Sequence, residues 1–209
     1  MTRLPRLNSK HKVCIICEGY EEHQYLNKLI NLSVWSNNYE FILINAKSAS
    51  NIFPKYQDAY NNARYEIILI FCDTDKPPFK EYNLIKNKIN GFHGKRNASN
   101  KTVIFANPCT MQIILLHFDD VLLTTQAKKT NSPIIYKLTG VENYDAKEEQ
   151  IKQICSKIFQ RTYVAMKKRL KNVKDSDTEC SSTNFGKFLE YFEDTDPKWI
   201  KEINKYLDE

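Results

Sequence analysis

The feature that most constrains this chain is an apolar run from Glu66 to Cys72 (EIILIFC) that leads directly into Asp73-Thr74-Asp75. A continuous apolar run is typical of a parallel strand that helices cover on both faces. Two carboxylates just past such a strand repel each other, and their desolvation is costly unless a cation neutralises them. We therefore expect a central strand whose end forms a D-x-D cation site. Mg²⁺ suits this site because it takes one or two carboxylates and keeps several waters.

Strand and helix patterns alternate on either side of this strand. The patterns predict strands at 13–17, 39–44, 66–72 and 102–106, and helices at 21–32, 52–64, 82–89 and 108–123. This alternation predicts an α/β fold with a doubly wound, mostly parallel sheet and right-handed crossovers. After about residue 124 the pattern predicts a helix at 147–170, a polar linker at 171–183 and one or two helices at 184–207. We expect a flexible basic leader (1–12), a catalytic domain (13–124) and a helical C-terminal subdomain (125–209).

Length and composition limit the classes of protein to which this chain can belong. A chain of 209 residues can bury a full core, and it has no apolar run near the roughly 20 residues of a membrane helix. Its six cysteines lie mostly in apolar segments, which favours reduced thiols and a cytoplasmic protein over a disulfide framework. The net charge of +6 favours a polyanionic partner such as nucleic acid.

Glu18 occupies the position after the first strand that Asp73 occupies after the third. Gly19 lets the chain turn there, and Glu22 lies one helical turn further on. Because ligand sites in parallel sheets lie at the carboxyl ends of the strands, Glu18, Glu22, Asp73 and Asp75 are the expected metal site. The alternative is that these acids are solvated, with Glu22 and its neighbour favouring the helix start through its dipole.

Three segments, in order, resemble a known family. The segment 13–22 (VCIICEGYEE) resembles the first TOPRIM motif, and 67–75 (IILIFCDTD) resembles the second. The stretch 106–118 (ANPCTMQIILLHF) is similar to the Asn-Pro-Cys helix of RloB-like proteins. Together they cover roughly residues 12 to 120, and three matches in order are more specific than any one of them.

The resemblance implies a TOPRIM nuclease fold, related to the TOPRIM domains of OLD-family proteins. It implies that Glu18 is an acid/base or metal ligand and that Asp73 and Asp75 bind Mg²⁺ or Mn²⁺. RloB-like proteins are associated with phage defence, including abortive infection, often beside an AAA- or ABC-type ATPase. This chain has no Walker A motif, so an ATPase activity would come from such a partner protein. The assembly of several copies is left open.

The chain departs from the family at Thr110-Met111, where relatives carry an aromatic-acidic pair. A helix carboxylate is therefore missing, and Gln112 and Asp119 are the candidates to replace it. His117 belongs to the same stretch. It is either a catalytic group for proton transfer or phosphate binding, or a hydrogen-bonded histidine of the core.

Basic residues are the candidates for nucleic-acid contacts, although charged helix residues also serve simply as a solvated face. The candidates are Lys76, Lys95, Arg96, Lys101, Lys167, Lys168 and Arg169. Lys76 follows the D-x-D directly and is expected to neutralise charge on a phosphate. We expect the other six to share one face.

The prediction is a metal-dependent nuclease that hydrolyses phosphodiester bonds in DNA or RNA, with tRNA among the RNA substrates to be tested. Two alternatives remain. One is a haloacid-dehalogenase-type phosphatase, in which Asp73 would attack phosphorus. The other is a catalytically inactive TOPRIM module that docks to an ATPase.

Overall fold

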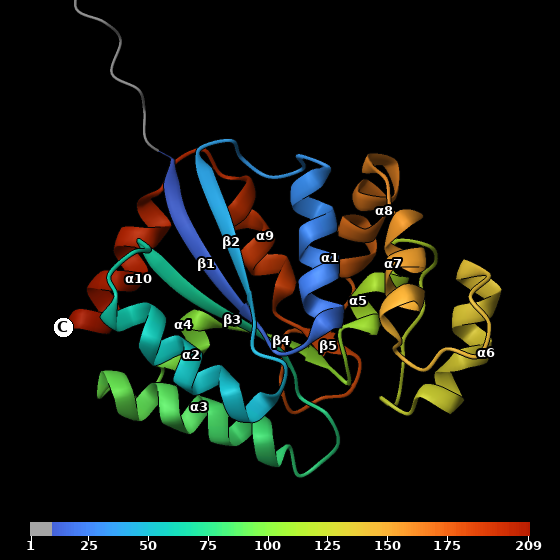
Figure 1. Ribbon diagram of the computed structural model, residues 1–209, viewed down its shortest axis with the longest axis horizontal. Coiled ribbons are helices and arrows are strands. Elements are labelled where there is room, and N and C mark those ends of the chain that lie inside the picture. Colours follow the sequence, from blue (N-terminus) through green and yellow to red (C-terminus); the bar gives the residue numbers. More distant parts are fainter. Residues whose placement is uncertain (1–9) are drawn as a thin grey trace, which may run out of the picture.

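A five-stranded sheet forms the centre of the molecule in the computed structural model, which describes residues 10–209 (Figure 1). The strands are β1 (His11–Cys17), β2 (Tyr39–Asn45), β3 (Ile67–Asp73), β4 (Val103–Asn107) and β5 (Ser182–Thr183). Their order is β2-β1-β3-β4-β5; the first four are parallel, and β5 runs antiparallel to β4. The predicted α/β fold with a mostly parallel sheet is confirmed.

Helices cover both faces of the sheet (Figure 1). They are α1 (Tyr20–Asn31), α2 (Ala49–Asn61), α3 (Lys80–His93), α4 (Ala98–Thr102), α5 (Met111–Leu115), α6 (Lys128–Thr139), α7 (Glu148–Ser156), α8 (Gln160–Leu170), α9 (Phe185–Glu193) and α10 (Lys198–Asp208). Helices α2, α3 and α4 lie on one face, and α1 and α9 on the other, with α7 and α8 beside α1. No helix within residues 10–209 is long and apolar enough to cross a membrane.

The order of the strands places a switch point between β1 and β3. The chain goes outward from β1 to β2, then crosses back over β1 to β3 and continues to β4. Open α/β sheets bind their ligands at the carboxyl ends of the strands where the order reverses in this way. Glu18 follows β1 and Asp73 ends β3, so the predicted acids lie at this point.

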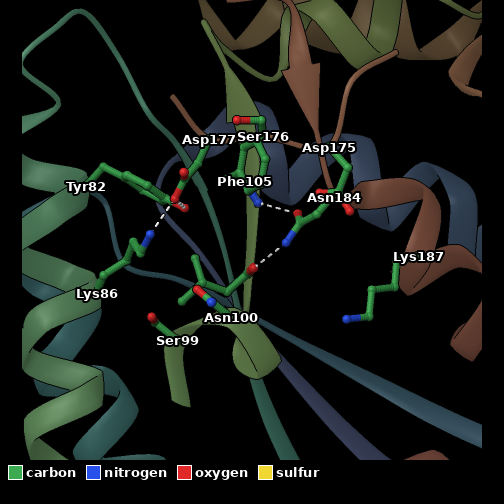
Figure 2. A pocket seen from close by; sticks show the side chains of 11 residues that line it. Tyr82, Lys86, Ser99, Asn100, Phe105, Asp175, Ser176, Asp177, Asn184 and Lys187 are labelled. Carbon is green, nitrogen blue, oxygen red and sulfur yellow. Dashed lines mark hydrogen bonds and ion pairs between the residues drawn. The ribbon is translucent and has the colours of Figure 1, made fainter. Parts of the chain in front are cut away.

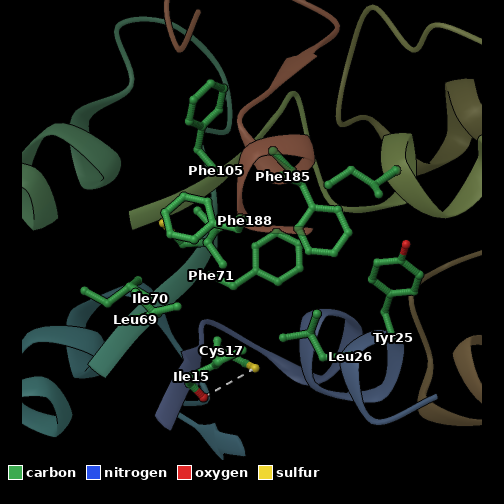
Figure 3. Close-up of a cluster of buried hydrophobic side chains, with 14 of the residues drawn as sticks. Ile15, Cys17, Tyr25, Leu26, Leu69, Ile70, Phe71, Phe105, Phe185 and Phe188 are labelled. Carbon is green, nitrogen blue, oxygen red and sulfur yellow. Dashed lines mark hydrogen bonds between the residues drawn. The ribbon is translucent and has the colours of Figure 1, made fainter. Parts of the chain in front are cut away.

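The surface near β4 is hollowed where α3, α4 and α9 approach this strand (Figure 2). A large part of the core lies between the sheet, α1 and α9 (Figure 3). Phe71 of β3 stacks on Phe185 of α9 with ring centroids 5.5 Å apart, and Tyr25 of α1 lies 5.9 Å from Phe185. These large apolar side chains are fully buried, which fixes α9 against the sheet although it is far away in the chain.

The structure corrects the expected element boundaries in two places. The helix expected at 108–123 is only the short α5, because Gln112 hydrogen-bonds the chain that turns back at Val121 and Leu123. The helix expected at 147–170 is interrupted: α7 ends at Ser156, and Thr162 caps α8 by accepting a hydrogen bond from the Phe159 N–H (2.9 Å).

Other segments hold more regular structure than expected. The linker expected at 171–183 supplies β5, and α6 was not expected. Residues 91–100, between the helix expected at 82–89 and the strand expected at 102–106, hold the end of α3 and the start of α4. Residues 1–9 of the expected leader lie outside the described residues, whereas His11 and Lys12 belong to β1. The proposed division of the chain near residue 124 stays a prediction.

Candidate metal centre

The loops after β1 and β3 are joined directly through Glu18. Cys17 and Phe71 are neighbours in the β1–β3 register, and the Glu18 N–H donates to the Phe71 carbonyl (2.9 Å). The Glu18 carboxylate in turn accepts a hydrogen bond from the Asp73 N–H through Oε2 (3.1 Å). The predicted convergence of these two loops is therefore present.

Asp73 is held by the loop that follows β4. Its Oδ1 accepts hydrogen bonds from the Thr110 N–H (2.7 Å) and from the Thr110 hydroxyl (2.8 Å). The Asn-Pro-Cys-Thr stretch thus delivers Thr110 to the end of β3. A carboxylate with one oxygen fixed in this way has a defined orientation, and its other oxygen is left for another partner.

Glu22 caps the helix that begins after Gly19. Its Oε2 accepts a hydrogen bond from the Gly19 N–H (2.8 Å), and the side chain is 4% exposed. Glu22 therefore contributes negative charge beside Asp73 and Glu18, while one of its oxygens is already occupied.

Glu18, Asp75 and Glu81 form a group of carboxylates at the ends of β1 and β3 and the start of α3. One oxygen atom from each lies within 4.8 Å of the others. Within residues 10–209 this is the one group of acids, histidines or cysteines with such spacing. Asp75 reaches it from a backbone position with φ of 59°, and Glu81 from the first turn of α3. Three oxygen ligands at this spacing are compatible with Mg²⁺ or Mn²⁺.

Glu81 was missed by the sequence analysis because the helix was expected to begin at Tyr82. The helix begins at Lys80, which brings Glu81 into its first turn and next to the D-x-D. An acid six residues after Asp75, at the start of a helix, was the signal that could have identified it.

Glu21 is the second acid that the sequence analysis did not place in the site. Its Oε2 accepts a hydrogen bond from the Tyr144 hydroxyl, whereas its buried Oε1 has no partner among the described residues. Glu21 lines a cavity of about 130 Å³ together with Asp73, Asp75 and Met111. A carboxylate from α1 therefore faces the cavity beside Met111, the position at which the helix acid is missing.

The two residues proposed to replace that acid have other roles. The Gln112 side chain binds the main chain of Val121 and Leu123. Asp119 is exposed, and its carboxylate accepts a hydrogen bond from the Asp120 N–H (2.9 Å).

Burial and mutual repulsion raise the pKa values of the clustered acids. Burial, followed by the charge of Glu22, raises the pKa of Glu18 to about 8. The same two causes raise the pKa of Glu21 to about 7, and that of Asp73 well above its usual value. Burial and the charge of Glu81 raise the pKa of Asp75. Such groups bind protons or cations more readily than isolated carboxylates do.

His117 is surrounded by core residues. It is 2% exposed, and its ring nitrogens pair with the Tyr25 hydroxyl (3.0 Å) and the Thr162 hydroxyl (3.3 Å). Burial, followed by the charge of Arg169, lowers its pKa to about 3. These surroundings are those of a neutral core histidine, and a catalytic role for His117 stays a prediction.

The basic candidates do not form one surface. Lys76 is exposed beside Asp75, and its charge opposes the rise in the pKa of that carboxyl. Lys95, Arg96 and Lys101 lie on the α3–α4 side of the sheet, whereas Lys167, Lys168 and Arg169 lie on α8, on the α1 side (Figure 1).

Two of the α8 candidates are engaged in contacts within the fold. Lys167 pairs with Glu193, and the Arg169 guanidinium donates to the Leu116 carbonyl (2.6 Å). Lys168 is exposed. The prediction that the six basic residues share one face is therefore wrong. Contacts of individual basic residues with nucleic acid stay predictions.

Comparisons with known proteins add no family assignment. No protein-family model, curated protein or solved structure matches the chain significantly.

Proposed function

We propose that the chain is a Mg²⁺- or Mn²⁺-dependent phosphodiesterase of the TOPRIM type that cleaves DNA or RNA. The observation that carries the proposal is the meeting of Glu18, Asp75 and Glu81 oxygens within 4.8 Å at the switch point of a parallel sheet. The three motifs that resemble TOPRIM and RloB-like sequences support it, because their residues surround this point.

The donor set fits a hard divalent cation. All three groups are carboxylates, and the raised pKa values of Glu18 and Asp75 reflect burial and repulsion that a cation would offset. Glu18, Asp75 and Glu81 would hold the metal. When bound, it would act as a Lewis acid toward the phosphate and lower the pKa of a water.

The remaining residues of the site orient these ligands. Thr110 fixes Asp73, whose N–H holds Glu18 in place. The Gly19 N–H fixes Glu22. Lys76 is the exposed cation next to Asp75, and it is suited to contact the phosphate of a substrate. In the proposed biological setting, the nuclease is the effector of a phage-defence system and an ATPase partner controls it.

The test combines metal binding with cleavage. Calorimetry with Mn²⁺ and a nuclease panel of plasmid, single-stranded DNA and tRNA should show metal binding and metal-dependent cleavage in the wild type. Glu18→Gln and Asp75→Asn should lose both, whereas Glu149→Gln, an exposed acid on α7, should retain both. The panel should be repeated with an ATPase partner if a candidate is known.

Metal binding and a separate trapping experiment distinguish the two alternatives. A wild type without metal binding would favour the inactive docking module, which the missing acid at Met111 supports. Trapping of a phosphoaspartate at Asp73 would favour the phosphatase. Either result would contradict the nuclease proposal.

A further inference from the structure

A shallow groove lies between α2 and α3, which are neighbours on one face of the sheet (Figure 1). It is lined by Ala49, Ser50 and Phe53 of α2 and by Glu81, Leu84, Ile85 and Lys88 of α3. Glu81 is also one of the three acids of the candidate metal centre. A substrate held at the metal centre would therefore lie next to this α2–α3 groove.

The four lining residues of α3 share one side of the helix. They are Glu81, Leu84, Ile85 and Lys88, at positions i, i+3, i+4 and i+7. Glu81 and Lys88 are therefore two turns apart, about 10 Å along the helix axis. The groove thus has a carboxylate of the metal centre at one end, an ammonium at the other, and apolar side chains between them.

The apolar surface of the groove is accessible to a ligand. Leu84 is 52% exposed, and Phe53 is partly exposed. The Phe53 ring packs nearly perpendicular to Phe92, with ring centroids 6.0 Å apart, which holds it in place. An oriented aromatic ring beside an exposed leucine offers apolar surface against which a planar ring can pack.

Lys88 adds a positive charge at the end of the groove that is distant from Glu81. Its ammonium lies 5.6 Å from the centre of the Phe53 ring and forms no ion pair with a carboxylate among residues 10–209. An exposed ammonium over an aromatic ring can also contact a phosphate. In a nucleic-acid strand each base lies between two phosphates, which matches the order metal centre, apolar surface and ammonium along the groove.

We propose that the α2–α3 groove holds the base next to the scissile phosphate, packed on Phe53 and Leu84, with the following phosphate at Lys88. This inference rests on the proposed function, because it places the scissile phosphate at the metal centre. A base within a duplex is paired and stacked, and it reaches such a groove only after it is flipped out at an energetic cost. An unpaired base packs on apolar side chains without that cost. The substrate class is therefore single-stranded DNA or RNA, or an unpaired segment of either.

Binding is tested by fluorescence anisotropy with short labelled single strands of DNA and RNA and with the corresponding duplexes. EDTA is present, so that neither metal binding nor cleavage is required. The wild type should bind single strands more tightly than duplexes, and the better of the two single strands identifies the substrate. Leu84→Gln should weaken single-strand binding about tenfold and leave duplex binding unchanged, as expected for loss of packing against a base. Val164→Gln, at a residue of α8 that is 54% exposed, is the matched control and should bind like the wild type.

Two further variants test the ring and the ammonium separately. Phe53→Leu keeps an apolar side chain in α2 and should weaken single-strand binding by a similar factor. Lys88→Gln should weaken binding and reduce the slope of log affinity against log salt concentration by about one, as expected for loss of one phosphate contact. Circular dichroism checks that the variants fold.

The inference is overturned by equal affinity of the wild type for single strands and duplexes, or by unchanged single-strand affinity in both Leu84→Gln and Phe53→Leu. If a second copy of the chain covers the groove instead, light scattering will show a wild-type dimer and a Leu84→Gln monomer with unchanged single-strand affinity. The proposed function fails in a different way, through a wild type that binds no Mn²⁺ in calorimetry.

Discussion

Helices α1 and α7 each carry a pair of glutamates in the first turn, in opposite surroundings. Each has two glutamates in its first turn, Glu21 and Glu22 in α1 and Glu148 and Glu149 in α7, and each has a capping side chain at its third position. In α7 the acids are exposed, and a hydrogen bond from Lys152 lowers the pKa of Glu148. In α1 the carboxylates are buried and their pKa values are raised.

The difference arises from the segment that precedes each helix. Helix α1 follows the central strand β1 at the switch point of the sheet, whereas α7 follows a loop. Acids at a helix start are favourable in both places because of the helix dipole. Of these two helices, only α1 directs its acids toward other carboxylates, so the same pair of residues serves as a surface feature in α7 and as part of a candidate site in α1.

Helix α3 offers the strongest test of this comparison, since its first-turn acid Glu81 is exposed and yet reaches the cluster. If the location of a helix start beside the carboxyl ends of the strands decides whether its acids bind metal, Glu81→Gln should weaken Mn²⁺ binding. Metal-dependent cleavage should fall about 100-fold, as expected for loss of a charged group that acts in the transition state. Calorimetry and nicking of plasmid measure the two effects. Glu149→Gln is the control; equal activity in both variants would exclude Glu81 as a ligand.

The pH dependence of stability is expected to be the next largest effect. The folded pKa values of Glu18 and Glu21, about 8 and about 7, lie above the ordinary value of 4.5. The folded state therefore binds more protons than the unfolded state between these values, so its stability falls as pH rises from about 4.5 to 8. Thermal unfolding in EDTA should show this fall.

Repeating the thermal unfolding with Mg²⁺ tests whether a cation offsets this fall in stability. A cation that binds the ionised folded state stabilises it most at high pH, so the fall in Tm should become smaller or vanish with Mg²⁺. Glu18→Gln in EDTA should also reduce the slope. A Tm that rises between pH 5 and 8 in EDTA would contradict the raised pKa values of the cluster. A Tm that does not change with Mg²⁺ would contradict cation binding by the cluster.

Much of this arrangement could be predicted from local sequence. The contacts that could not be predicted join segments that are far apart in the chain. The apolar strand before Asp73 and the similar run before Glu18 were enough to predict parallel strands of one sheet with acids at their carboxyl ends. The burial of Glu21 depends on Tyr144, which lies 123 residues further along the chain. No local sequence pattern predicts that contact.

The Asn-Pro-Cys-Thr stretch holds a second contact that local sequence could not predict. The predicted helix there was too long, and the side chain that matters for Asp73 is Thr110, just before the short α5. The resemblance to RloB-like proteins indicated that this stretch belongs to the site. The hydrogen bond from Thr110 to Asp73 could not be predicted, because it depends on the pairing of β3 with β4.

A single substitution in α1 should stabilise the protein without metal. Glu21→Gln removes a buried charge while keeping an oxygen for the Tyr144 hydroxyl. At pH 8 in EDTA we expect stabilisation of about 1–3 kcal/mol, since the pKa of Glu21 is raised to about 7. At pH 4 the gain should disappear, because the glutamate is then protonated in both states. Urea unfolding at the two pH values measures this; an equal effect at both would mean that charge is not the cause.

The corresponding change in α7 should have the smallest effect. Glu148 and Lys152 form an exposed i,i+4 pair (2.8 Å), and such pairs contribute little because water and salt screen them. Glu148→Gln should therefore leave Tm unchanged within error at pH 8, with or without Mg²⁺. If it instead changed stability as much as Glu21→Gln does, the contrast between the two helix starts would reflect the residue type, and the location of α1 beside β1 would no longer explain it.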